Sequence, residues 1–151
     1  MTDRPPHARG TMTVKFLNRG FFQRIFGVPA TPKPFDPQCW AFSDGKITID
    51  LQRAAELKKP GGALGVEDGG LPIRVLVIRG DDGKFYAFHN RCTHIGHRRL
   101  DPVPGTGTVQ CCSVGKSTYT YDGKKVYGPP SGPIKTFKVE VEGDRLVVFL
   151  G

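Results

Sequence analysis

The alternation of hydrophobic and polar residues predicts a series of short strands joined by tight turns. Residues 47–51 alternate strictly, as a half-buried strand does, and residues 73–79 form a β-branched run. The Asp-Asp-Gly-Lys turn at residues 81–84 predicts a hairpin into a strand at 85–88. Residues 52–59 predict one or two helical turns. Further strands are predicted at 108–110, 117–121, 125–127, 135–141 and 145–150. This spacing favours an all-β fold, a small antiparallel β-sandwich or barrel.

The N-terminal part of the chain has a different pattern. Residues 14–27 place four phenylalanines and an isoleucine among basic side chains, which predicts a short amphipathic helix interrupted at Gly20. Such a helix can dock on its own domain, on a partner or on a membrane surface, and the pattern leaves all three open. Residues 28–38 contain four prolines and predict an extended linker, and residues 1–13 predict disorder. We therefore expect a basic aromatic segment with a Pro-rich linker over residues 1–37, and one domain over residues 38–151.

Composition agrees with a folded domain of short strands. The chain has 151 residues, of which 38% are hydrophobic, so wholesale disorder is excluded. Its 20 glycines and 13 prolines favour turns over long helices. The longest apolar runs fall far short of the roughly 20 residues that cross a bilayer, so we expect no transmembrane span.

Positive charge is concentrated near the N-terminus. The net charge is +8, with six Lys/Arg against two acids in residues 1–37 and sixteen against twelve in the remainder. No run of five basic residues occurs, and aromatic residues are not interleaved with basic ones in the way that a base-stacking surface needs, so we expect no nucleic-acid partner. An acidic protein partner suits this charge better. We see no secretory leader and therefore expect a cytoplasmic protein, in which the four cysteines bind metal or react.

One constellation of residues carries candidate chemistry. Cys92 and His94 are two residues apart on a loop that follows a predicted strand, and Cys111 follows His94 after sixteen intervening residues, on a following hairpin loop. Side chains from two such loops can point into one small cavity. Thiolate and imidazole together suit zinc, copper or an iron–sulfur centre.

In these residues the chain resembles the Rieske iron–sulfur family, whose pattern is Cys-x-His, about 15–17 residues, then Cys-x-x-His. Cys92, His94 and Cys111 match three of its four ligands. The resemblance covers roughly residues 40–151 and includes the strand entering the first loop, a Pro-rich loop at 128–134 and a closing hairpin at 139–148. It implies a Rieske-like all-β fold with a cluster-binding subdomain of two loops. It also implies a 2Fe-2S cluster and one-electron transfer to a partner oxidoreductase, as a component of a larger system rather than a complete enzyme.

The sequence departs from that pattern at the fourth ligand. Val114 stands where the family has histidine, and valine cannot bind metal. Cys112 is the nearest substitute ligand, and His97 is the next. A register that uses Cys112 in place of Cys111 puts Ser117 and Tyr119 where many family members hydrogen-bond near the cluster, but it supplies no second histidine either.

Two other outcomes stay open. The first is a mononuclear zinc site, held by Cys92, His94 and His97 with Cys111 or Cys112. In the second, the fold is kept without any metal, as an accessory or interaction subunit.

Overall fold

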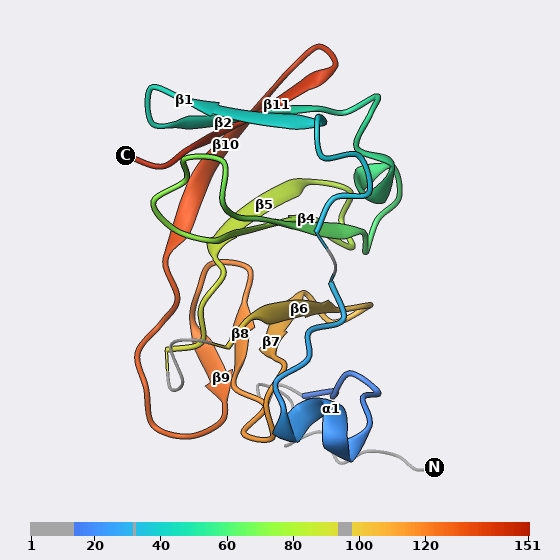
Figure 1. The fold of residues 1–151 in the computed structure, drawn as a ribbon. Coiled ribbons are helices and arrows are strands. Elements are labelled where there is room, and N and C mark those ends of the chain that lie inside the picture. Colours follow the sequence, from blue (N-terminus) through green and yellow to red (C-terminus); the bar gives the residue numbers. More distant parts are fainter. Residues whose placement is uncertain (1–13, 32, 94–97) are drawn as a thin grey trace.

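The computed structural model describes residues 14–31, 33–93 and 98–151. The predicted disorder at residues 1–13 lies outside this described part. Within the described part the chain forms one short α-helix, one 3-10 helix and eleven strands (Figure 1). In chain order these are α1 (Phe21–Ile25), β1 (Trp40–Ser43), β2 (Lys46–Asp50), η2 (Ala55–Leu57), β3 (Ala63–Val66), β4 (Val75–Arg79), β5 (Phe85–His89), β6 (Leu100–Val103), β7 (Thr108–Cys111), β8 (Thr118–Thr120), β9 (Lys125–Tyr127), β10 (Thr136–Glu142) and β11 (Arg145–Phe149).

Seven strands form one antiparallel sheet in the order β1-β2-β11-β10-β5-β4-β3. Strand β10 joins its two halves: Thr136 and Phe137 pair with β5, whereas the residues from Lys138 onward pair with β11. The curled sheet encloses a first core of alternating residues, among them Ile47 and Ile49 of β2. The predicted all-β fold is therefore confirmed.

Strand β4 has no exposed face. Val75 and Val77 point into the first core, whereas Leu76 and Ile78 point into a second core on the other side of the sheet. All four side chains are fully buried. This two-sided burial explains why the strand reads as a continuous apolar run instead of alternating with polar residues.

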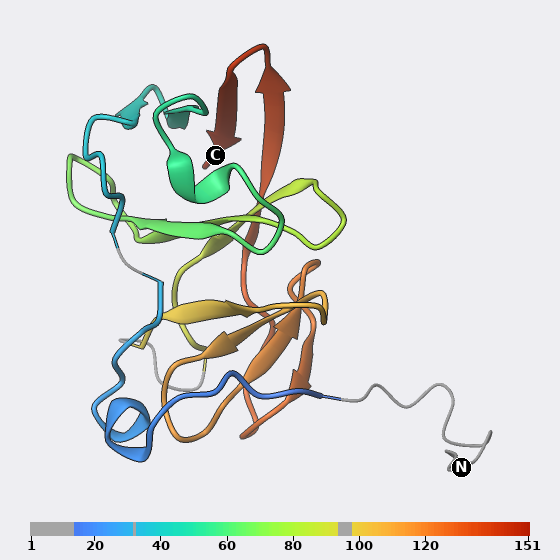
Figure 2. The same ribbon diagram turned by 90° about the vertical axis from the view of Figure 1, so that its right-hand side faces the viewer.

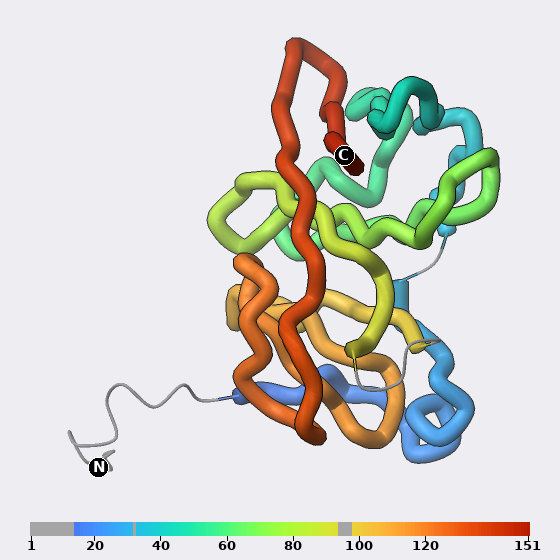
Figure 3. The backbone as a smooth tube through the Cα atoms, turned by 90° about the vertical axis from the view of Figure 1, so that its left-hand side faces the viewer, coloured from blue at the N-terminus to red at the C-terminus, as the bar shows by residue number. Residues whose placement is uncertain are grey.

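The second core belongs to an inserted subdomain, residues 90–135, which lies between β5 and β10 in the sequence. Its four strands form an antiparallel sheet in the order β6-β7-β8-β9. The chain then returns past this small sheet into β10 and reaches the far end of the molecule (Figure 3). The packing of the small sheet against one face of β4 places both cysteine loops in the second core.

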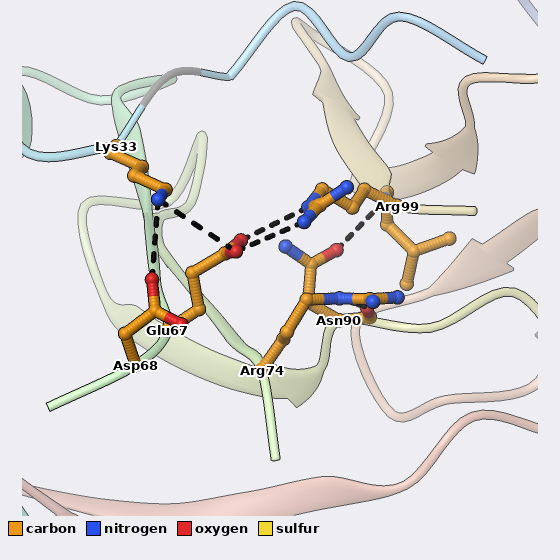
Figure 4. Close-up of polar contacts among 7 residues, drawn as sticks. Lys33, Glu67, Asp68, Arg74, Asn90 and Arg99 are labelled. Atoms are coloured by element: carbon orange, nitrogen blue, oxygen red, sulfur yellow. Dashed lines mark hydrogen bonds and ion pairs between the residues drawn. The ribbon is translucent and has the colours of Figure 1, made fainter. Parts of the chain in front are cut away.

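Polar contacts tie the inserted subdomain to the larger sheet (Figure 4). Glu67, just after β3, forms a two-pronged ion pair with Arg99, just before β6, with both N–O distances at 3.0 Å. Lys33 of the linker reaches Asp68 at 3.3 Å and Glu67 at 3.9 Å. The buried Asn90 side chain accepts a hydrogen bond from the first backbone N–H of β6 at 2.7 Å. These contacts fix the orientation of the two sheets and the linker beside them.

Candidate sulfur site in the inserted subdomain

Three cysteines come together on the two loops of the inserted subdomain. Cys92 follows β5, Cys111 ends β7 and Cys112 comes next; all three side chains are buried. The backbone N–H of Cys92 donates to Arg98 O, and that of Cys112 donates to Arg99 O, both at 3.0 Å. The two loops are therefore fastened to adjacent residues, one to Arg98 and the other to Arg99, which brings cysteines from distant parts of the sequence side by side.

The Cys111 thiol contacts both other thiols. Its interaction with the Cys112 thiol is the main cause that raises the pKa of Cys111, while the Cys92 thiol acts in the opposite direction. The pKa of Cys112 is lowered to about 7, chiefly because its sulfur accepts a hydrogen bond from Cys111. Deprotonated cysteine is the form that binds metal. The environment therefore favours a metal-binding protonation state for one of the three cysteines.

Hydroxyl groups lie beside two of the three sulfurs. The Tyr119 hydroxyl lies 3.7 Å from the Cys92 sulfur, and the Ser113 hydroxyl lies 3.1 Å from the Cys111 sulfur. The Tyr119 oxygen also accepts the backbone N–H of Thr93 at 3.2 Å. Burial is the main cause that raises the pKa of Tyr119, so this hydroxyl keeps its proton and can donate it to a sulfur. Hydrogen bonds to ligand sulfurs are one means by which a protein sets a cluster's potential.

The Pro-rich loop at 128–134 lies against both cysteine loops. The Thr93 hydroxyl donates to Gly132 O at 2.7 Å, next to Cys92. On the other loop, a Cβ built on Gly115 would lie 3.4 Å from the ring of Pro129. The loop thus contacts the chain beside each of the two cysteine loops.

The other positions considered for the ligand set do not lie with the three cysteines in the described part of the chain. Val114 is 54% exposed and lies on the turn after Cys112, so its side chain points away from the buried sulfurs. His94 and His97 lie outside the described residues. Among the residues that the structure does describe, no three His, Cys, Asp or Glu side chains are arranged to hold a metal ion.

The N-terminal segment, residues 14–31, covers the outer face of the inserted sheet (Figure 2). Asp101 of β6 and Gln110 of β7 are directly opposite each other in the sheet and are both buried. Asp101 accepts the backbone N–H groups of Ala30 and Thr31 at 2.8 Å each, and Gln110 accepts that of Leu17 at 3.1 Å. Two polar residues that a bare sheet would expose to water therefore fasten this segment to the sulfur-bearing subdomain.

Arg24 is the second anchor of the N-terminal segment. It is only 5% exposed, and its guanidinium donates to Cys111 O and Ser113 O, both at 3.2 Å. It also donates to Leu17 O at 2.7 Å and to the Gln110 side chain at 2.9 Å. Burial lowers the pKa of Arg24 below its usual value, although an arginine stays charged. A buried positive charge is thus held directly against the backbone of the second cysteine loop.

Gly27 brings the segment into contact with a candidate ligand. Its carbonyl accepts a hydrogen bond from the Cys112 thiol at 3.2 Å. Gly27 has a φ of +64°, and a Cβ there would lie 1.6 Å from the Arg98 guanidinium, so both the backbone conformation and the space require glycine. The sequence pattern gave no signal for either Arg24 or Gly27, because nothing local marks a residue that acts on a loop more than eighty positions away.

Comparison with known proteins identifies the class to which this fold and site belong. The family model for the Rieske [2Fe-2S] domain matches residues 48–138. The chain therefore belongs to the Rieske [2Fe-2S] domain family, as the sequence resemblance predicts.

Similar proteins include an oxygenase subunit and the iron-sulfur subunit of a cytochrome b6-f complex. The chain is 32% identical over 107 residues to the glycine betaine monooxygenase oxygenase subunit of Chromohalobacter salexigens, and this match covers 67% of the chain and 24% of that subunit. It is 27% identical over 155 residues to the cytochrome b6-f complex iron-sulfur subunit of Chlorobaculum tepidum, with 98% and 83% covered. The chain thus spans only about a quarter of the oxygenase subunit.

Solved structures show the same fold. The ferredoxin of carbazole 1,9a-dioxygenase from Nocardioides aromaticivorans IC177 gives a TM-score of 0.55 at 21% identity, covering 69% of this chain and 95% of that one. A quaternary ammonium Rieske monooxygenase in complex with L-carnitine gives 0.52 at 19% identity, covering 84% and 33%.

The described residues fit the two-cysteine half of the ligand set of the 2Fe-2S cluster that the family implies. In a Rieske cluster two cysteines hold one iron, and Cys92 and Cys111 are in contact here, with hydroxyl groups beside both sulfurs. Family and fold together support electron transfer by a Rieske-type 2Fe-2S cluster. No helix in the described residues is long and apolar enough to cross a bilayer.

Proposed function

We propose that the protein is an electron-transfer component whose 2Fe-2S cluster has one non-standard ligand. Cys92 and Cys111 hold one iron, His94 holds the second iron, and Cys112 completes the set in place of the missing histidine. Such a cluster takes up and releases one electron at a time. His97 is the alternative fourth ligand.

The contact of the Cys112 thiol with Cys111 carries this proposal. A cysteine that faced solvent or the first core could not reach a cluster held by Cys111, whereas Cys112 is buried beside it. Val114 points outward, so the position of the usual histidine offers no donor. Replacing a neutral imidazole with a thiolate adds negative charge to the cluster. It should therefore lower the reduction potential from the Rieske range toward about −400 mV, the value of all-cysteine plant-type ferredoxins.

A redox protein with an acidic surface is the partner that we propose, and the reducing cytoplasm is the proposed compartment. The net charge of +8 supports attraction to such a surface. In a solved complex an oxygenase and a ferredoxin of carbazole 1,9a-dioxygenase form such a redox pair, and this chain resembles that structure with a TM-score of 0.55 at 21% identity. The rate of electron transfer to an acidic ferredoxin-type acceptor should fall as ionic strength rises.

Anaerobic purification followed by iron and sulfide analysis and EPR tests the ligand set. We expect two irons and two sulfides in the wild type. Cys112→Ala should lose the cluster or shift its EPR signal, whereas Cys39→Ala should match the wild type because Cys39 is equally buried but lies in the first core. An unchanged EPR signal in Cys112→Ala would exclude Cys112 as a ligand.

Val114→His provides the converse test, because it restores the family pattern. Position 114 faces outward, so this histidine can replace Cys112 as a ligand only if the turn after Cys112 turns inward around the cluster. An ordinary Rieske spectrum with a higher potential would show that exchange, whereas a wild-type spectrum would leave Cys112 as the fourth ligand. A colourless wild-type protein with one zinc would replace the proposal by the mononuclear site, and one with no metal would replace it by a cluster-free accessory subunit.

A further inference from the structure

Helix α1 has its polarity reversed relative to an ordinary surface helix. Its buried residue is the charged Arg24, which is held by backbone carbonyls of the second cysteine loop. The opposite side carries Phe21, Phe22 and the following Phe26, which are 68%, 71% and 70% exposed. A surface helix normally turns its apolar side inward and its charges outward. The protein therefore anchors this helix by its cation and presents its phenylalanines to the surroundings.

Exposed hydrophobic residues are concentrated at this end of the molecule. Ten large hydrophobic side chains are exposed in the described chain; six of them lie between residues 16 and 28, and Val114 and Tyr127 lie beside that segment. At about 150–250 Å² for a whole side chain, the three phenylalanines alone expose roughly 300–500 Å². Apolar patches of this size on a monomer mark interaction sites. We call Phe21, Phe22, Ile25 and Phe26 the aromatic face.

The charge around the aromatic face has a single sign. No acidic residue occurs between positions 4 and 35. Lys116 lies over the ring of Phe16 at 4.7 Å, and both residues line a groove of about 580 Å³ that extends to Phe21 and Val114. The Arg98 guanidinium donates a hydrogen bond to the carbonyl of Ile25 at 3.3 Å. No ion pair among the described residues includes Arg98 or Lys116. The aromatic face is thus bordered by cations whose charge is not neutralised within the described chain.

We propose that the aromatic face docks the protein on an anionic lipid bilayer, with the phenylalanines in the headgroup–acyl boundary and the flanking cations at the lipid phosphates. Exposed phenylalanine and isoleucine with a basic border is the composition of interfacial membrane helices. A protein–protein interface of similar size would contain several hydrogen-bonding groups and favour tyrosine, tryptophan and arginine at its centre. The aromatic face offers only hydrocarbon side chains.

Docking in this way would hold the second cysteine loop at the bilayer surface, since Arg24 joins the helix to that loop. Membrane docking through the aromatic face involves the polypeptide alone and does not require a cluster. Binding can be followed by sedimentation of the protein with vesicles, whatever its iron content. Failure of this proposal is therefore distinguishable from failure of the proposed ligand set.

The test compares vesicles of phosphatidylcholine alone with an equal mixture of phosphatidylcholine and phosphatidylglycerol. The wild type should sediment with the anionic vesicles, and less so at high salt. Replacing Phe21, Phe22 and Phe26 together by serine should weaken binding at least a hundredfold, since burying one phenylalanine contributes roughly tenfold or more. Phe35→Ser is the matched control, because Phe35 is 92% exposed but lies on the linker, and it should bind as the wild type does.

Fluorescence locates the contact. In a Trp40→Phe background, Phe22→Trp should shift to shorter wavelength on anionic vesicles and Phe35→Trp should not. Equal binding of the triple variant and the wild type, or no binding of the wild type, would overturn the proposal. A wild-type dimer that the triple variant breaks, without vesicle binding, would assign the aromatic face to a second copy of the chain instead.

Discussion

Removing the guanidinium of Arg24 should detach the N-terminal segment from the sulfur-bearing subdomain. In Arg24→Ala, the carbonyl oxygens of Cys111 and Ser113 and the side-chain oxygen of Gln110 lose a charged donor in buried surroundings. Water can replace that donor only if the segment lifts away from the sheet. The substitution therefore tests whether one buried cation holds the segment in place.

The magnitude follows from the hydrogen bonds that are lost. A hydrogen bond to a charged group contributes about 1.5–3 kcal/mol, and two of the four bonds of Arg24 reach fully buried carbonyls. The cost of burying the guanidinium itself offsets part of this sum. We expect a net loss of about 3–5 kcal/mol, because three buried oxygen acceptors lose this charged donor at about 1–3 kcal/mol each. This corresponds to roughly two to four orders of magnitude in the equilibrium for opening the segment.

Hydrogen exchange measures that equilibrium directly. The amides of Leu17, Ala30 and Thr31 donate to side chains of the inserted sheet, so their exchange should accelerate by that factor in Arg24→Ala. In Arg24→Lys the exchange rates should lie between those of the wild type and Arg24→Ala, because a lysine ammonium cannot reproduce the planar arrangement of donors on the guanidinium. Phe22→Ala, on the exposed side of the same helix, is the control. Exchange of these amides that is equally slow in Arg24→Ala and the control would refute the reasoning.

Three further predictions test the rest of the molecule. Glu67→Gln removes the negative charge of the ion pair with Arg99 (Figure 4); because the Glu67 side chain is only 16% exposed, we expect the free energy of unfolding, measured by chemical denaturation, to fall by about 1–2 kcal/mol. Asp68→Asn is the control: this side chain is 76% exposed, so the loss should be less than about 0.5 kcal/mol, and equal losses in the two variants would contradict the prediction. Burial raises the pKa of Cys39 to about 11, so iodoacetamide at mildly alkaline pH should label it, as judged by mass spectrometry, only after unfolding. The hydrogen bond to Asp82 raises the pKa of Tyr86 to about 12. Because the folded state favours the neutral phenol, this contribution to stability is complete below the ordinary pKa near 10 and is lost as pH rises toward 12; Tyr86→Phe should lose less stability across that interval.

The sequence pattern predicted the strands that alternate hydrophobic and polar residues or flank a Gly-containing turn. The alternation at residues 47–51 became β2, and the Gly-containing turns placed the β4–β5 and β10–β11 hairpins. Strands β1, β3 and β6 were not predicted. Strand β6 contains an aspartate and a proline, and β3 contains a glycine, so their strand character comes from pairing with neighbours and not from local preference.

Helix α1 was predicted in part. The helix begins directly after Gly20, at Phe21, whereas residues 14–19 of the predicted helix are not helical. The amphipathic pattern, however, does not tell which side of the helix faces the protein. The structure buries the basic side, because the inserted sheet offers carbonyl groups and the Gln110 side chain as partners for Arg24.

The sequence by itself determined the family and the residue types at the sulfur site, because Cys-x-His and a later cysteine are local patterns that survive any arrangement of the chain. It also determined that no histidine stands at position 114. Only the tertiary structure decided that Cys112 lies with Cys111, that Asp101 and Gln110 are covered, and that the phenylalanines of α1 face outward. Each of these depends on residues more than seventy positions apart or on a choice between two faces, and such choices are made by packing and by the pairing of buried polar groups.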